Sequence, residues 1–238
     1  MYSKNTMKRT INIFWSCLEP EWMRAEEPTP ILPEFIRNDK MSESRIPQCP
    51  AFRKELHNVF GVKSIYDYEF SVNTETGEVS TTTYDQQFYN RHVILRSMKE
   101  RIFTFSQEMI FFTDESSLTM SGDLLPYLED NNITERCIVY PGQFDIGRWY
   151  RPVEFAFKLK DQYDTFKIES GEIYQYIRFH TDNNIKFIQF RETPKLNEIL
   201  KDITQIRSNK KGIFSLDYYY ERFKLKKLIM KEIKENLL

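Results

Sequence analysis

The chain has 238 residues, 40% of them hydrophobic and 15% aromatic, so it can bury a sizeable core and global disorder is excluded. Its 34 lysines and arginines nearly balance its 35 aspartates and glutamates, for a formal net charge of −1. This balance disfavours nucleic acid and anionic membranes as partners. No apolar run is long enough to cross a bilayer, so we also expect no membrane partner.

The N-terminus and the cysteines predict a reducing compartment. Segment 1–16 carries basic residues but no sustained apolar core, so it does not resemble a secretory signal peptide. Cys17, Cys49 and Cys137 are widely spaced and form no CxxC pair, which predicts three reduced thiols and no zinc ribbon. We therefore expect a cytoplasmic location.

Residues 1–61 predict a strand, a proline-rich arm and a short helix. Alternation of apolar side chains indicates a strand over residues 11–16. Six prolines interrupt residues 19–50 and forbid long regular elements, so we expect an ordered arm on the domain surface. Pro50 then begins a predicted helix over residues 50–59, with Gly61 as its C-cap.

The middle of the chain predicts many short strands. Runs of β-branched and aromatic residues, bounded by turn residues, favour strands at 65–72, 78–84, 92–97, 102–106, 109–113, 137–140, 153–159, 165–168, 174–179 and 186–189. Residues 114–132 are polar and predict irregular structure. The fold class is therefore mainly β (α+β), with a sandwich-like or barrel-like core.

Residues 194–238 predict a helical extension of a single β-rich domain that covers residues 1–193. A short helix is expected over 194–203, and an apolar stripe predicts one long helix over 216–238, with lysines on its other faces. Such a stripe docks on the chain's own β core, packs on a neighbouring subunit, or leaves a basic surface for an acidic partner.

Two segments in the centre of the chain resemble the β-clip fold of trimeric dUTPases and dCTP deaminases. They are GQFD at 142–145, which is followed by Trp149, Tyr150 and Arg151, and FKIESGEIYQ at 166–175. The resemblance implies that Asp145 activates water beside a Mg²⁺-bound phosphate and that Gln175 recognises the nucleotide. It also implies that Ser116 and Ser117 donate hydrogen bonds to phosphate.

Each of these residues also has a simpler interpretation. Asp145 precedes Gly147 and can cap the backbone of a turn. Gln175 can be a polar residue on the exposed face of a strand, and Ser116 and Ser117 can belong to an ordinary polar loop. Tyr150 and Arg151 form either a platform for an anion or a base, or a surface cation–π contact.

The sequence also departs from the dUTPase pattern. Glu115 stands where the family has the arginine of its phosphate motif, and a carboxylate there repels a triphosphate. The glycine-rich C-terminal arm of the family is replaced by the basic helix. These differences favour a non-catalytic β-clip-like domain, so we expect no cofactor, with Mg²⁺ needed only if the enzyme alternative holds.

A metal site is also considered and set aside. His180 and Asp182 have the His-x-Asp spacing of non-haem iron sites, which need a second histidine from a later strand. No histidine follows His180, so no metal site is predicted.

The chain as a whole resembles proteins encoded by tailed bacteriophages. We therefore expect a structural or protein-interaction protein in the cytoplasm of an infected bacterium, with association with the virion as an alternative location. The predicted partners are other proteins or further copies of the chain, for instance in a trimer, because β-clip domains build threefold assemblies. Two alternatives stay open: a dUTPase-like nucleotide pyrophosphatase or deaminase, and a small-ligand-binding module.

Overall fold

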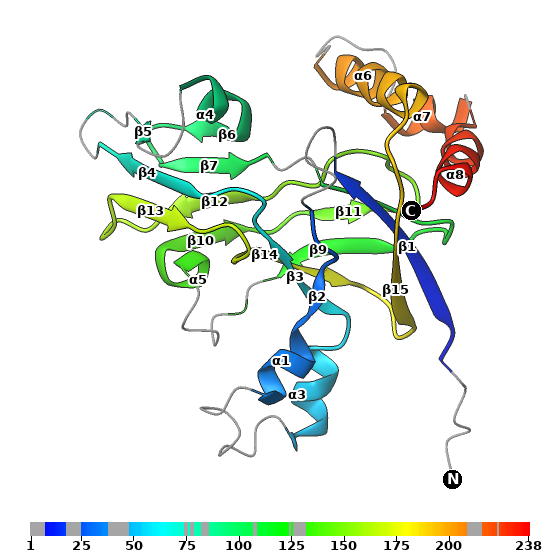
Figure 1. Ribbon diagram of the computed structural model, residues 1–238, viewed down its shortest axis with the longest axis horizontal. Helices are drawn as coiled ribbons and strands as arrows, with labels where there is room; N and C mark the ends of the chain where they lie inside the picture. Colours follow the sequence, from blue (N-terminus) through cyan, green and yellow to red (C-terminus); the bar gives the residue numbers. More distant parts are fainter. Residues whose placement is uncertain are drawn as a thin grey trace.

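The computed structural model is mainly β, as the sequence predicts, with most of its helices at two ends of a set of sheets and α4 and α5 beside the strands β6 and β10 (Figure 1). Helices α6, α7 and α8 gather at one end, and α1 and α3 lie at the other. The structure describes residues 8–17, 25–37, 48–73, 76, 79–81, 86–106, 109–123, 125, 132–208, 216–222 and 224–238. Parts of the predicted proline-rich arm, 19–24 and 38–47, lie outside these residues.

The described strands form four sheets. The five-stranded sheet has the order β11, β9, β14, β3, β2, with bounds Gln143–Asp145, Thr119–Asp123, Ile173–Phe179, Val59–Lys63 and Thr29–Pro30. The four-stranded sheet has the order β10, β12, β7, β6, with bounds Cys137–Tyr140, Ala156–Leu159, Ile102–Phe105 and Val93–Ser97. Every described pair in these two sheets is antiparallel.

Two three-stranded sheets complete the β structure. The β1 sheet has the order β15, β1, β8, with bounds Asn184–Gln189, Thr10–Cys17 and Met109–Phe112. The β4 sheet has the order β13, β4, β5, with bounds Thr165–Ile168, Tyr68–Val72 and Val79–Thr81. Strand β1 pairs in parallel with β15 and antiparallel with β8, so it is the centre of its sheet.

The described helices are short except at the C-terminus. Their bounds are Ile31–Arg37 for α1, Pro50–Glu55 for α3, Gln86–His92 for α4, Asn132–Arg136 for α5, Pro194–Ser208 for α6, Leu216–Arg222 for α7 and Leu225–Glu235 for α8. None of the helices in the described part of the chain is both long and apolar enough to cross a membrane.

Aromatic side chains fill the core between the sheets, which accounts for the high aromatic content. Phe70 and Phe103 meet edge to face with ring centroids 5.0 Å apart, and Phe105 stacks on Phe166 at 5.2 Å. All four rings are at most 3% exposed. Such pairs each contribute about 0.5–1.5 kcal/mol in addition to the free energy gained by burying their area. Phe70 and Phe166 belong to the β4 sheet, and Phe103 and Phe105 belong to the four-stranded sheet, so this cluster joins the two sheets.

Both faces of β1 are buried, because its sheet lies between the main core and the C-terminal helices. Ile13 and Trp15 belong to the main core, whereas Phe14 belongs to a second cluster under the helices. Ile229 and Ile233 of α8 are fully buried in that second cluster. The apolar stripe of the C-terminal segment is therefore covered by the chain's own β1 sheet.

Three local predictions are wrong in their details. Helix α3 ends at Glu55 instead of residue 59, and Gly61 lies in β3, where the side chain of Ile173 packs against its backbone and leaves no room for a Cβ. The segment 114–132, predicted to be irregular, contains the central strand β9. Its sequence TMSGD is polar, yet Met120 and Gly122 face inward and are buried.

The predicted long helix over 216–238 is two helices, α7 and α8. Lys224 separates them with a φ of 49°, in the left-handed region that a continuous helix cannot contain. Helix α4 was also not predicted, because residues 86–92 have few apolar side chains and sit beside a predicted strand.

Candidate functional site

The turns that carry Asp145 and the serine pair lie against each other. The backbone N–H of Ile146 donates to the carbonyl of Leu118 over 3.0 Å, and that of Thr113 donates to the carbonyl of Ile146 over 3.1 Å. Gly147 is required between them, because a Cβ there would lie 2.1 Å from the carbonyl oxygen of Glu115. The structure therefore brings Asp145 close to the turn of Ser116 and Ser117, both of which are exposed.

The charged groups around these turns include both carboxylates and cations, and several of them pair with one another. Glu115 pairs with Arg9, and Asp114 lies 3.2 Å from the ammonium of Lys234. Lys226 donates to the carbonyl of Glu115 over 3.2 Å. Burial lowers the pKa of Lys226, and the nearby Asp145 and Asp114 oppose that shift. The described cations at these turns therefore already contact a carboxylate or a backbone carbonyl, which disfavours a phosphate site here.

Tyr150 and Arg151 serve packing. Tyr150 is fully buried under the C-terminal helices, and its hydroxyl donates to the carboxylate of Glu192. Its backbone N–H donates to the hydroxyl of Tyr220 over 2.8 Å, which in turn donates to the Tyr150 carbonyl over 2.9 Å. The guanidinium of Arg151 lies 5.0 Å from the centre of the Phe144 ring, so it makes a cation–π contact, but with Phe144 instead of the neighbouring Tyr150.

Gln175 lies apart from these turns, in the interior between two sheets. It is 3% exposed, so the interpretation as a solvent-facing strand residue is wrong. It pairs with Val62 of β3 and lines a cavity that has none of Asp145, Ser116 or Ser117 in its wall. Within one chain, this cavity therefore does not bring Gln175 together with Asp145, Ser116 or Ser117.

His180 of the considered iron site, and His92, a histidine that precedes it in the chain, both have other partners. The Nε2 atom of His180 lies 2.8 Å from the hydroxyl of Ser121, and the Nδ1 atom of His92 lies 3.0 Å from the carbonyl of Ser106. Among the residues that the structure describes, no group of three or more histidine, cysteine, aspartate or glutamate side chains is placed to hold a metal ion.

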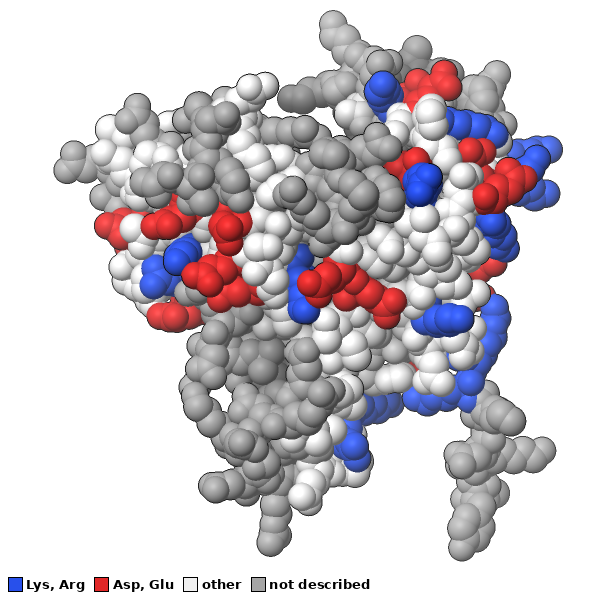
Figure 2. Space-filling model, viewed as in Figure 1, with Lys and Arg blue, Asp and Glu red and all other residues white. Residues whose placement is uncertain are grey.

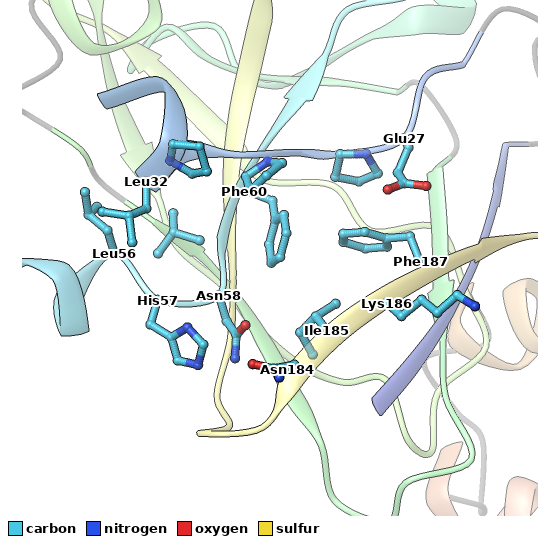
Figure 3. A pocket seen from close by; sticks show the side chains of 14 residues that line it. Glu27, Leu32, Leu56, His57, Asn58, Phe60, Asn184, Ile185, Lys186 and Phe187 are labelled. Carbon is cyan, nitrogen blue, oxygen red and sulfur yellow. The ribbon is translucent and has the colours of Figure 1, made fainter. Parts of the chain in front are cut away.

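A larger hollow lies between the N-terminal arm and strand β15, and we call it the arm–β15 groove (Figure 3). Its volume is about 590 Å³. Phe60 and Phe187 form its floor, with ring centroids 4.9 Å apart. Its walls are mainly apolar and include Pro28, Pro30, Pro33, Leu32, Leu56 and Ile185.

Local sequence explains why this groove forms. The prolines of the arm cannot enter a long helix or a central strand, so the arm contributes only the two-residue strand β2 against β3. Asn58 has a φ of 59°, and its side-chain amide donates to the carbonyls of Thr181 and Asn183, both over 2.8 Å. These bonds hold the turn before β15 against the start of β3, which places β15 opposite the arm.

One edge of β15 faces away from its partner β1. The N–H groups of Asn184 and Phe190 donate to carbonyls that flank or belong to β1, over 2.9 and 3.1 Å. Backbone groups of alternate residues in a parallel strand point to opposite sides, so those of Ile185, Phe187 and Gln189 point outward. The carbonyl of Gln189 accepts from the N–H of Leu238 over 3.0 Å.

The outward backbone groups of Ile185 and Phe187 have no hydrogen-bond partner among the described residues. Both residues also line the arm–β15 groove. This combination is a short length of unpaired strand edge beside an apolar hollow. It can pair with an extended chain, because each outward residue offers one donor and one acceptor.

Polar groups lie around the rim of the groove. Lys186 and Glu27 lie toward one end, and His57 and Asn58 lie toward the other (Figure 3). The Nζ atom of Lys8 lies 3.2 Å from Nε2 of His57. Figure 2 shows basic side chains along the edge of the molecule where β1 begins, while both signs of charge occur elsewhere on that face.

Sequence reasoning did not find this groove. It predicted β15 as a strand and the prolines as an arm, but their apposition depends on tertiary pairing. One usable signal was the Asp182-Asn183-Asn184 turn, which fixes where β15 begins. No signal in the sequence shows that β15 pairs in parallel with β1, and that pairing decides which backbone groups face the groove.

Comparison with known proteins adds no further assignment. No family model matches the sequence, no curated protein matches it, and no solved structure matches its fold. The resemblance to the β-clip and to phage proteins therefore stays a prediction.

Proposed function

We propose that this chain is a protein-interaction module that binds an extended peptide segment in the arm–β15 groove. The segment would add a strand to the outer edge of β15. The observation that carries the proposal is the pair of outward, unpartnered backbone positions, Ile185 and Phe187, beside an apolar groove. It agrees with the interaction role that the sequence predicts.

Strand addition suits this edge for a geometric reason. Two outward residues offer two N–H donors and two carbonyl acceptors, spaced as the backbone of an extended strand requires. The opposite wall is rich in proline, whose ring nitrogen carries no hydrogen, so it offers few competing donors. An incoming strand would thus take its hydrogen bonds from β15.

The side chains of the groove suggest the composition of the ligand. Apolar residues at alternate positions would pack on Phe60 and Phe187, because successive side chains of a strand point to opposite faces. Lys186 and the Lys8–His57 pair would attract acidic residues at the remaining positions. We therefore propose an extended segment that alternates apolar and acidic residues.

The identity of the partner rests on sequence resemblance alone. A phage structural protein, a virion location and a trimeric assembly remain proposals of that kind. The enzyme alternative requires Asp145, Ser116 or Ser117 and Gln175 to converge, which the arrangement within one chain does not support.

The test removes one outward hydrogen-bond donor and leaves the β1 ladder intact. Ile185→Pro deletes the outward N–H at an edge position, where a proline is tolerated. Ile185→Ala is the matched control, because it removes the same side chain and keeps the N–H. Binding is measured by fluorescence anisotropy with labelled eight-residue peptides that alternate valine or phenylalanine with aspartate.

We expect Ile185→Ala to weaken binding by a few fold and Ile185→Pro to weaken it at least tenfold. In the wild-type protein, bound peptide should slow hydrogen exchange at the amides of Ile185 and Phe187. Equal affinities for the two variants, or no change in exchange at these amides, would show that strand addition to β15 does not occur. Circular dichroism of both variants confirms that they fold.

A further inference from the structure

A second cavity lies between the four-stranded and five-stranded sheets, and we call it the Gln175 cavity. Its volume is about 240 Å³. Strand β10 forms one wall, and β12 and β14 form the others, with helix α5 beside it. The lining side chains are mostly apolar and include Leu125, Ile133, Cys137, Val139, Phe155 and Phe157.

Gln175 is the buried polar exception in this wall. Its side chain is 3% exposed, and its Nε2 atom has no hydrogen-bond partner among the residues that the structure describes. A buried amide without a partner is unfavourable, and nearly all such groups in folded proteins are bonded. The Nε2 atom of Gln175 therefore needs a hydrogen-bond acceptor, and the cavity is large enough to hold a molecule that supplies one.

Lys160 supplies a second polar group to the same cavity. Its ammonium donates to the carbonyl of Thr134 over 3.0 Å and to that of Glu135 over 2.6 Å. An ammonium has three N–H donors, so one donor stays available beyond these two bonds. Lys160 lines the cavity together with Gln175, so both side chains can donate to a ligand oxygen. Asp123 and Thr134 also line the cavity, and the carboxylate of Asp123 is paired with Arg178.

Cys137 contributes a neutral wall and no reactive group. Burial raises the pKa of its thiol well above the usual range, against the opposing effect of Lys160 and Arg136. The thiol is therefore protonated at neutral pH and behaves as a small apolar side chain. Binding in this cavity would be non-covalent.

We propose that the Gln175 cavity binds a small, mainly apolar molecule that carries a carbonyl or carboxylate oxygen. The oxygen accepts a hydrogen bond from Nε2 of Gln175, with Lys160 as the second donor, and the apolar part packs against Phe155 and Phe157. The volume is somewhat below the common range of about 300–1,000 Å³ for small-molecule sites, which restricts the ligand to short chains or single rings. This site is separate from the arm–β15 groove and does not depend on the function proposed for it.

The proposal predicts an unusual effect on stability. Gln175→Leu removes the unpartnered amide and keeps a side chain of similar size, so the protein without ligand should melt at or above the wild-type temperature. If the amide instead stabilised the folded protein, the Gln175→Leu variant would melt several degrees below the wild-type temperature. Gln143→Leu is the matched control, because Gln143 is exposed and its side chain donates to the hydroxyl of Thr119 at the molecular surface.

Binding is measured with octanoate, octanamide and toluene as probes, by thermal shift and isothermal titration calorimetry; toluene is the control because it has no oxygen to accept a hydrogen bond. Octanoate and octanamide should bind the wild-type protein and the Gln143→Leu variant more tightly than toluene. Gln175→Leu should lose at least tenfold in affinity for the first two probes and little for toluene. Val139→Phe, which fills the cavity, should abolish binding of all three.

Three results would overturn the proposal. One is the absence of binding by every probe at millimolar concentration. Another is equal affinity for octanoate and octanamide in Gln175→Leu and the wild type. The third is unchanged binding in Val139→Phe, which would place the ligand elsewhere. If Gln175→Leu fails to fold, the amide has a structural role and the proposal is also wrong.

Discussion

At the scale of single residues, Gly147 decides whether two turns can pack. A Cβ at this position would lie 2.1 Å from the carbonyl oxygen of Glu115, which is backbone and cannot rotate away. We expect Gly147→Ala to force the turns of Asp145 and Ser117 apart and to destabilise the protein by about 2–3 kcal/mol. Urea denaturation of the variant and the wild type measures this change.

Gly171→Ala is the control for this prediction. Gly171 has a φ of 88°, but a Cβ there would meet nothing within 4 Å. Its substitution should therefore cost only backbone strain, about 1–2 kcal/mol. If Gly147→Ala proves no more destabilising than Gly171→Ala, the steric account of the turns is wrong.

The sequence could predict the turns but not the environment of each candidate residue. The glycine near Asp145 indicates a turn, and the structure has one there. The burial of Gln175 could not be predicted, because both faces of β14 are covered and its alternation of side chains no longer distinguishes inside from outside. The burial of Tyr150 could not be predicted either, because it depends on the C-terminal helices, which pack over it in the second cluster.

At the scale of elements, α8 packs on the face of the β1 sheet that is opposite the main core. Ile229 is fully buried among Phe14, Phe112 and Tyr150 in the second cluster. We expect Ile229→Ala to cost about 2–5 kcal/mol, the range for large-to-small changes in a core. Lys227→Ala, an exposed substitution on the same helix, should change the free energy of unfolding by less than about 0.5 kcal/mol.

The Ile229→Ala variant also distinguishes packing of α8 on the chain's own sheet from packing on a neighbouring subunit. If α8 packed on a neighbouring subunit in solution, the loss caused by Ile229→Ala would grow or shrink with protein concentration. Packing on the chain's own sheet makes the loss independent of concentration. Chemical denaturation at two concentrations a hundredfold apart therefore checks the contact that the structure shows.

The elements themselves follow well from the sequence where the pattern is local. Strands 137–140 and 165–168 agree with β10 and β13 to the residue, because each is a compact apolar or aromatic run between turn residues. Strand β9 was missed, because a strand held by neighbours on both sides tolerates a polar sequence. The break at Lys224 leaves the apolar spacing unchanged, so periodicity could not reveal it.

At the scale of the whole molecule, the order of the sheets is the part that the sequence could not predict. Strand β15 follows β14 directly in the chain, yet it joins β1 in parallel and leaves β14 to pair with β3 and β9. Because β15 pairs with β1 and not with β14, its other edge stays unpaired beside the arm–β15 groove. A local pattern carries no information about pairing over such a distance.

Buried phenols distributed over the fold should make the whole protein sensitive to alkaline pH. Burial raises the pKa of Tyr150 and Tyr174 well above 10, and it raises that of Tyr89 to about 12. In the unfolded chain these groups ionise near pH 10, so above that pH the folded state binds more protons than the unfolded state. Stability should be fully present below about pH 10 and should fall as the pH rises further.

Urea denaturation at a series of pH values from 8 to 11.5 measures this effect. The double variant Tyr89→Phe and Tyr174→Phe should lose less stability across the series than the wild type, because two of the shifted groups are gone. Tyr218→Phe, at an exposed position, should follow the wild-type curve. A wild-type stability that stays constant up to pH 11.5 would mean that these phenols reach solvent at little cost, and the close packing of the aromatic core would then be in error.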